Sequence, residues 1–465
     1  MPPQIAAVLF AVGIVGLFWL DRERDVQISK ALWVPTLWVL VNASRPVSEW
    51  LVAAGWDVGP TVASVDLYLD GSPIDRNVFL VLLGAGVAVL IGRREAVKQL
   101  LQQNKAVLIF FGYCTLSILW SDYPYIAFKH WTKGIGDLVM VFVVVTEPEV
   151  KEGIKRLLVR LSFLLVPLSV MLIKYFPQFG QNYNRWTWIQ EYVGVSTTKN
   201  MLGMICLFCG LASAWRFVEA WSDREQPLRL RRLLAHGTIL FMVIWLLTLC
   251  HSMTSLSCFL MACGLIAASK TSLVRRKPST VYALVAAMVG VAFFALFMDP
   301  GGGLVESLGR DPTLTGRTAI WNLVLGLHTN PLVGTGYESF WLGDRLQHVW
   351  DVYPGIQEAH NGYLEIYLNL GYCGLALMLL VILAAGRRTI RLFYDDMTWG
   401  VLALAYVVVG VIYNFTEAGF RMLCPIWFML LLFTVAAPLL EHEAAAEASE
   451  AYEFAESDLE QMMIN

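Results

Sequence analysis

The sequence contains repeated apolar stretches long enough to cross a lipid bilayer, and this feature constrains the fold more than any other. A helix needs about 20 apolar residues to span roughly 30 Å of hydrocarbon. We place these stretches near 4–20, 31–44, 78–92, 106–120, 134–147, 157–174, 199–215, 236–250, 255–269, 280–298, 362–386, 399–414 and 422–440. The first lacks a basic segment before it and a small-residue cleavage site after it, so we expect a retained span.

The composition supports the same class of protein, because 57% of the residues are hydrophobic and only 15% are charged. A soluble domain normally carries a higher density of charge. We therefore predict an all-α polytopic membrane protein with about 12–13 transmembrane helices and one large periplasmic loop that contains short helices.

Most Lys and Arg residues lie in alternate connections between the predicted spans. These connections fall at 22–30, 93–105, 151–156, 216–232, 270–277 and 387–391. Basic residues near span ends are retained on the cytoplasmic side, so we expect these six connections to be cytoplasmic. The loops at 121–133, 175–198 and 299–360 should then face the opposite side.

This orientation divides the chain into four parts. Residues 1–298 are predicted to form the N-terminal transmembrane helices, 299–360 the large periplasmic loop and 361–440 the C-terminal transmembrane helices. Residues 441–465 are rich in acidic residues and lack Lys and Arg, which is typical of a solvated tail. The tail either keeps the end soluble or docks to a cytoplasmic partner.

Several cations lie at the outer ends of spans, against the charge bias, and such residues are candidates for binding an anion. Each could instead pair with an outer-loop carboxylate such as Asp122, Glu191 or Asp311. The candidates for substrate binding are Arg185, Lys199, Arg310, Arg317 and Arg421.

Lys199 follows Ser196-Thr-Thr at the start of a predicted helix, where free backbone N–H groups attract phosphate. Ordinary capping by Ser or Thr is the alternative. The segment that contains His130 precedes a span, and we interpret His130 as a solvated loop residue.

Apolar residues recur at helical spacing in the large loop, from Ile320 to Leu327, and predict an amphipathic helix that lies on the membrane or caps the bundle. Arg317 occupies the first turn of this helix, where a cation is unfavourable. Its position indicates an anionic partner, either a ligand or Asp311.

His360 directly precedes Asn361-Gly362 and a long apolar run, so it should lie at a helix N-terminus on the outer surface. A helix N-terminus lowers the pKa of an imidazole and keeps it neutral. His360 is therefore a candidate general base, although a structural His bonded to loop backbone fits the same position.

The segment HNGYLEIYLNLGYCGLALMLL resembles the signature of the O-antigen ligase and polymerase superfamily, in which a His-Asn or His-Ser pair opens the helix after the large periplasmic loop. WSDYP, TTKNMLG, TGRTAIWN and NPLVGTGYESFW follow the order of that family. SRPVSEWL and DGSPIDR are more typical of its exopolysaccharide-polymerase branch. The chain departs from the family at Thr198, where a His is common, and at HSMTS, where an Arg often follows a Ser.

The resemblance implies a bacterial inner-membrane glycosyltransferase with its active site on the periplasmic side. Its donor would be an undecaprenyl diphosphate-linked oligosaccharide, its acceptor a growing polysaccharide and its surroundings membrane lipid. Other polysaccharide assembly and export proteins are possible partners, and nucleic acid is not expected. No cofactor or metal is expected, because the outer loops show no closely spaced acidic pair.

Within this interpretation His360 is the base, and the five cations named above surround the diphosphate. Asn361, Glu417 and Tyr337 support the site; Glu417, four residues before Arg421, should orient it across one helix face. Two alternatives stay open. A ligase would transfer the glycan to another lipid or to protein, and a transporter would move it without chemistry.

Overall fold

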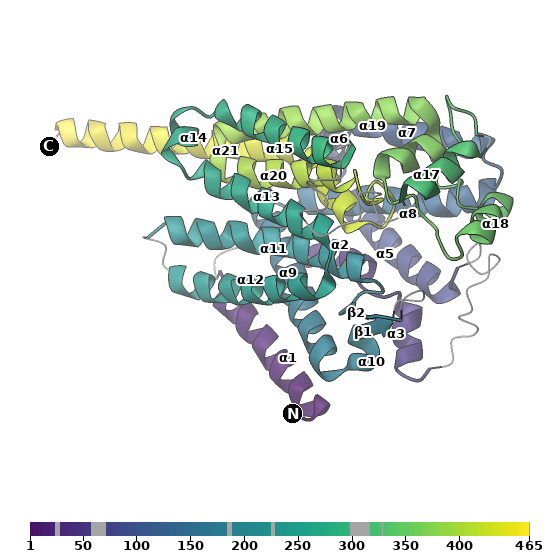
Figure 1. Ribbon diagram of the computed structural model, residues 1–465. Helices are drawn as coiled ribbons and strands as arrows, with labels where there is room; N and C mark the ends of the chain where they lie inside the picture. Colours follow the sequence, from purple (N-terminus) through teal and green to yellow (C-terminus); the bar gives the residue numbers. More distant parts are fainter. Residues whose placement is uncertain are drawn as a thin grey trace.

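The chain folds into a bundle of helices, as expected for an all-α membrane protein (Figure 1). The computed structural model describes residues 1–23, 28–56, 71–183, 188–224, 228–297, 317–327 and 329–464. The helices that correspond to the predicted spans are α1 (Pro3–Leu20), α2 (Trp33–Ala43), α5 (Pro73–Gly92), α7 (Lys105–Ser117), α8 (Pro124–Val145), α9 (Val150–Tyr175), α11 (Lys199–Ser222), α12 (Arg229–Cys250), α13 (Met253–Ser269), α15 (Thr280–Phe297), α19 (Gly362–Asp395), α20 (Met397–Tyr413) and α21 (Pro425–Ile464).

Shorter elements join these helices. They are η1 (Lys30–Leu32), α3 (Val47–Ala53), α6 (Arg94–Gln103), η2 (Ile118–Trp120), α10 (Pro177–Gly180), α14 (Ser272–Arg276), α17 (Arg317–Gly326) and α18 (Gly343–Val352). Strands β1 (Gln181–Tyr183) and β2 (Gln190–Tyr192) form an antiparallel pair.

Seven of the described helices are long and apolar enough to cross a membrane: α1, α5, α9, α11, α12, α19 and α21. The helical segments Lys105–Trp120, Met253–Ser269, Thr280–Phe294 and Met397–Tyr413 are apolar but shorter. Helix α2 has only 11 residues, and α8 carries Lys129, Lys133 and Asp137 along its length. Because α8 begins at Pro124, the prediction of a loop up to residue 133 was wrong, and His130 lies on a helix.

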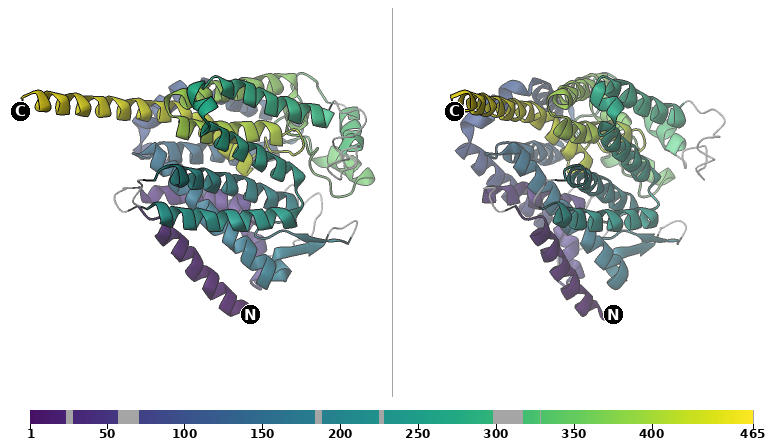
Figure 2. Two further views of the ribbon diagram at one scale, coloured as in Figure 1. Left: turned by 60° about the vertical axis from the view of Figure 1, so that its left-hand side comes forward. Right: turned by 90° about the vertical axis from the view of Figure 1, so that its left-hand side faces the viewer.

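Burial separates the centre of the bundle from its lipid-facing edge. Helices α9, α11 and α21 are mostly buried, and nearly every residue of α20 is buried. By contrast, α1 and α5 are mostly exposed, and α1 leaves the bundle at an angle in all three views (Figures 1 and 2). The last part of α21 projects beyond the other helices.

The connections predicted to be cytoplasmic gather at one end of the bundle. Glu147 accepts hydrogen bonds from Arg93, at 2.7 Å, and from the backbone of Ser29. Lys151 pairs with Asp396 at 3.3 Å, and Arg388 donates to Asn104. These contacts bring four of the six connections together, and their cytoplasmic location stays a prediction. Helices α17 and α18 lie at the other end of the bundle (Figure 1).

The loop 331–341 packs directly against a break in α19. Gly371 interrupts the helix with φ +65°, and a side chain there would collide with the backbone of Leu332. The freed backbone groups bond to the loop, where the Tyr372 N–H donates to Pro331 O at 2.9 Å and the Gly336 N–H to Asn369 O at 2.8 Å. The loop is thereby fixed beside the start of α19.

A second apolar core fixes the short helices above the bundle. Ile320 and Val324 of α17 are buried together with Phe340, Trp341 and Leu346. The prediction of an amphipathic helix that caps the bundle is confirmed. This packing holds Arg317, the first residue of α17, over the ends of α19 and α20.

Candidate active site

The loop between α20 and α21 forms one wall of the site and is braced from two sides. The Asn414 side chain accepts the N–H groups of Gly419 and Phe420, both at 2.8 Å. On α8, Asp137 accepts the Leu423 N–H at 2.9 Å and Trp38 Nε1 at 2.7 Å. Such bonds satisfy backbone donors that no helix uses.

Glu417 and Arg421 both lie on this loop, outside any helix. The prediction that they share one helix face, with Glu417 orienting Arg421, was therefore wrong. Each residue pairs with a different partner, as described below.

The segment His360-Asn361-Gly362 docks onto the same loop. Asn361 caps α19 by accepting the N–H groups of Tyr363 and Leu364, each at 3.0 Å. The Gly362 N–H donates to Asn414 O and Glu417 O, and any side chain on Gly362 would collide with Asn414. The supporting role predicted for Asn361 thus has a physical basis as a helix cap.

His360 itself has φ +50°, a left-handed conformation that non-glycine residues rarely adopt. Its imidazole lies between two carboxylates. Nδ1 is 3.0 Å from Glu358 Oε1 and 3.4 Å from Glu417 Oε2. Backbone strain of this kind tends to occur at functional sites, where the surrounding structure maintains it.

Each carboxylate also holds one arginine. Arg317 Nη2 lies 2.9 Å from Glu417 Oε1, and Arg421 Nη1 lies 2.8 Å from Glu358 Oε2. Arg317 additionally donates to the backbone oxygen of Thr416. We call these five residues, Arg317, Glu358, His360, Glu417 and Arg421, the His360 cluster.

The carboxylates control the protonation of His360. Burial alone would lower its pKa, but contacts with Glu358 and Glu417 outweigh burial and raise the pKa to about 10. The pKa of Glu358 falls to about 2 despite burial, because of His360 and Arg421. The prediction that the helix N-terminus keeps His360 neutral was wrong: in the resting protein the imidazole is protonated.

With His360 protonated, the cluster carries three positive and two negative charges, so it has a net positive charge and can accept an anion. The two arginines differ in access. The Arg421 side chain is 32% exposed, whereas that of Arg317 is only 10% exposed and is engaged by Glu417 and Thr416. Arg421 is therefore the cation that a ligand reaches first.

The structure does not place all predicted substrate-binding residues in this cluster. Lys199 pairs with Glu191 at 2.9 Å, one of the carboxylate partners considered as an alternative. The Thr198 side chain accepts the Met201 N–H, so ordinary capping also occurs there. Arg185 and Arg310 lie outside the described residues.

The ligand atoms of Glu358, His360 and Glu417 lie within 4.8 Å of one another, an arrangement that could hold a metal ion. The two acidic residues are 59 positions apart in the sequence, which is why the search for a closely spaced pair missed them. In the described structure, Arg317 pairs with the carboxylate of Glu417 and Arg421 pairs with that of Glu358.

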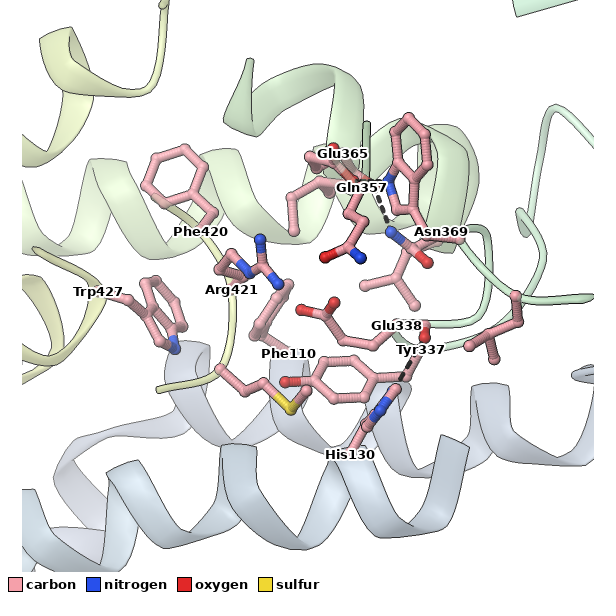
Figure 3. A pocket seen from close by; sticks show the side chains of 15 residues that line it. Phe110, His130, Tyr337, Glu338, Gln357, Glu365, Asn369, Phe420, Arg421 and Trp427 are labelled. Atoms are coloured by element: carbon pink, nitrogen blue, oxygen red, sulfur yellow. Dashed lines mark hydrogen bonds between the residues drawn. The ribbon is translucent and has the colours of Figure 1, made fainter. Parts of the chain in front are cut away.

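A pocket adjoins the cluster and shares Arg421 with it (Figure 3). Its empty space, counted out to bulk solvent, is about 680 Å³. It is lined by Phe110, His130, Tyr337, Glu338, Trp341, Leu342, Gln357, Glu365, Ile366, Asn369, Leu370, Phe420, Arg421, Met422 and Trp427. Of these, sequence reasoning had named only Tyr337 and Arg421 as site residues.

Two interactions explain how the pocket is built. His130 Nδ1 lies 3.1 Å from the backbone oxygen of Glu338, so His130 is not the solvated loop residue that we predicted. Trp341 Nε1 donates to Glu365 Oε2 at 2.8 Å and closes one side. Glu338 and Glu358 had no obvious sequence signal except their position beside the motifs GTGY and HNG.

Comparison with known proteins finds a family model and a relative that are similar to this chain. The family model described as O-antigen ligase matches residues 238–380, a segment that includes Arg317, Glu358 and His360. The exopolysaccharide production protein ExoQ of Rhizobium meliloti (strain 1021) is 25% identical over 319 residues, which cover 65% of this chain and 70% of that protein. Residues 238–380 are therefore similar to the O-antigen ligase family, and much of the chain is similar to an exopolysaccharide production protein.

This similarity supports a role of the polysaccharide polymerase or ligase kind, and together with the apolar helices it points to a multi-pass bacterial membrane protein. Glu417 and Arg421 lie beyond the matched segment, yet they complete the His360 cluster from the next helical connection.

Proposed function

We propose that this protein polymerises exopolysaccharide or O-antigen repeat units at the periplasmic face of the inner membrane. The donor is an oligosaccharide linked to undecaprenyl diphosphate, and the acceptor is a hydroxyl group of a second glycan. The observation that carries the proposal is the placement of His360 between two carboxylates that each hold an arginine.

His360 removes the proton of the acceptor hydroxyl. Because Nδ1 faces Glu358 and Glu417, Nε2 is the nitrogen that remains for the acceptor. A carboxylate behind an imidazole orients the ring and stabilises the imidazolium that forms. Since the resting imidazole is protonated, it first releases this proton to solvent, and the neutral form then acts as a strong base.

The transfer is a single displacement. The acceptor oxygen forms a bond to the anomeric carbon while the bond from that carbon to the phosphate oxygen breaks. The electron pair leaves with the lipid diphosphate, and the acceptor proton moves to His360. Arg421 binds the departing phosphate oxygens through charge-assisted hydrogen bonds, where negative charge increases in the transition state.

Arg317 keeps Glu417 in place and contributes positive charge from a buried position. Because two arginines supply the charge that the leaving group needs, we propose that the reaction requires no metal ion. Glu358, His360 and Glu417 could hold a metal ion, and a chelator would then abolish transfer if the reaction needed that ion. We expect transfer to survive extensive treatment with a chelator.

Reconstitution of the purified protein with lipid-linked repeat units, followed by gel analysis of the products, tests the class of function. A ladder of lipid-linked multimers supports a polymerase. Transfer of the glycan to a different lipid would show a ligase instead. Translocation of the donor without any new glycosidic bond would refute the proposal and identify a transporter.

A further inference from the structure

The proposed chemistry assigns no role to the pocket beside the His360 cluster. It meets the cluster at Arg421, and Gln357 of its lining directly precedes Glu358. A group bound in the pocket would therefore lie next to the reacting atoms.

The lining combines flat aromatic surfaces with polar groups, as sites for sugar rings do. Trp341, Trp427 and Phe420 line it as largely buried aromatic side chains. Several polar side chains are already engaged: Glu365 accepts from Trp341, and Asn369 Oδ1 accepts the N–H groups of Ser339 and Phe340. These bonds fix the walls of the pocket.

Further polar side chains face the pocket. Those of Glu338, Gln357 and Arg421 converge on the same space, where Glu358 holds Arg421 from one side (Figure 3). No hydrogen bond of the Gln357 carboxamide is found within the described part of the chain. Carboxylate, carboxamide and guanidinium together offer the acceptors and donors that adjacent sugar hydroxyls require.

The backbone at Glu338 is a second, independent observation. In the segment GTGYE, Gly334 and Gly336 occupy left-handed conformations, as expected of glycine. Glu338 has φ +48°, where glycine would be less strained. A Glu in this conformation, with its carboxylate directed into a pocket, points to a functional role for the side chain.

We propose that this pocket is a saccharide subsite, in which Glu338 and Gln357 bind the hydroxyl groups of one sugar ring that lies against the aromatic wall. The inference rests on the proposed glycosyl transfer and adds a site for the sugar itself. The ring belongs either to the donor, next to its diphosphate, or to the end of the acceptor.

Binding to the full-length protein in nanodiscs tests the subsite. Three probes are titrated: the free repeat-unit oligosaccharide, the lipid-linked repeat unit and undecaprenyl diphosphate without sugar. Glu338→Gln should weaken binding of at least one sugar-bearing probe about tenfold or more. Binding of undecaprenyl diphosphate should not change, which shows that Arg421 remains in place. Glu49→Gln, on α3 and outside the pocket lining, is the matched control.

The pattern of losses identifies the sugar. Weaker binding of only the lipid-linked repeat assigns the pocket to the donor, and weaker binding of the free oligosaccharide assigns it to the acceptor. Unchanged binding of both sugar-bearing probes overturns the proposal. Sugar binding by a wild-type protein that performs no transfer would refute the proposed function but leave the subsite intact.

Glu338→Gly separates binding from folding. Glycine relieves the backbone strain, so the thermal midpoint should stay the same or rise while sugar affinity falls. A lower midpoint with unchanged affinity would show that Glu338 is structural, and would overturn the proposal.

Discussion

Replacing Glu358 with Gln should move the pH dependence of transfer to lower pH. The pKa of His360 is about 10, against a usual value of 6.5, because two carboxylates contact its Nδ1. Because burial lowers the pKa, the two carboxylates together contribute more than this net shift, so removing one of two equal contributors should lower the pKa by at least about 2 units, or roughly 2–3 kcal/mol or more. The low pKa of Glu358 reflects the same contact between Glu358 and His360, so the free energy of this contact is counted only once.

The sign follows from the role of the neutral imidazole. Below the pKa of His360 only a small fraction is neutral, so the wild-type rate should rise with pH and level off near the pKa. In Glu358→Gln the rate should level off at least about two pH units earlier. Glu358→Gln also removes the partner of Arg421 and so can weaken donor binding. Single-turnover transfer at saturating donor, measured between about pH 6 and pH 10, reports the transfer step without this effect.

Glu152→Gln, on α9 in a Glu152–Lys155 pair, is the matched control and should leave the profile unchanged. An identical profile in wild type and Glu358→Gln would refute the assignment. A wild-type rate that falls as the pH rises would mean that protonated His360 is the active form and that Glu358 or Glu417 is the base.

Arg317→Lys should impair transfer nearly as much as Arg317→Ala, because Lys lacks the planar fork that joins Glu417 to Thr416 O; full activity of the Lys variant would leave only a diffuse charge effect. His360 should stabilise the fold fully below pH 6.5 and lose this contribution, at most about 5 kcal/mol, as the pH rises through its pKa. The thermal midpoint of wild type should therefore fall more than that of His360→Ala between neutral pH and about pH 10, and equal slopes would contradict the raised pKa. In intact cells, an impermeant thiol reagent should label Val352→Cys but not Ser222→Cys, in a background without the exposed Cys373; the reverse pattern would invert the topology.

The helices could be predicted because the length of an apolar run directly sets what crosses a membrane. The start of α8 was misplaced for the same reason, since Lys129 and Lys133 interrupt the apolar pattern without ending the helix. Helix boundaries near charged residues depend on packing, which hydropathy does not describe.

The sequence also located Arg317 and His360 correctly as unusual residues, but not their partners. Arg317 binds Glu417, 100 residues later, and His360 lies against a carboxylate from the same distant loop. Local position predicted a lowered pKa for His360, whereas these long-range contacts raise it. Charge interactions at about 3 Å dominate over a helix end.

The misreading of Glu417 and Arg421 has a specific cause. Their four-residue spacing fits a helix, but Asn414 ends α20 and its side chain captures the N–H groups of Gly419 and Phe420. Asn and Gly together are typical of a turn. Glu338 was missed because a Tyr-Glu-Ser segment carries no indication of a left-handed conformation, for which glycine is the usual residue.

His360→Gln tests the central claim, that His360 removes the acceptor proton. Gln keeps hydrogen-bonding capacity but cannot act as a base, so single-turnover transfer should fall about 10²–10⁴-fold. Affinity for the lipid-linked donor should stay within a few-fold of wild type, because Arg421 keeps its contact with Glu358. Transfer at the wild-type rate by His360→Gln, with the donor bound normally, would contradict the account and leave His360 as a positioning residue.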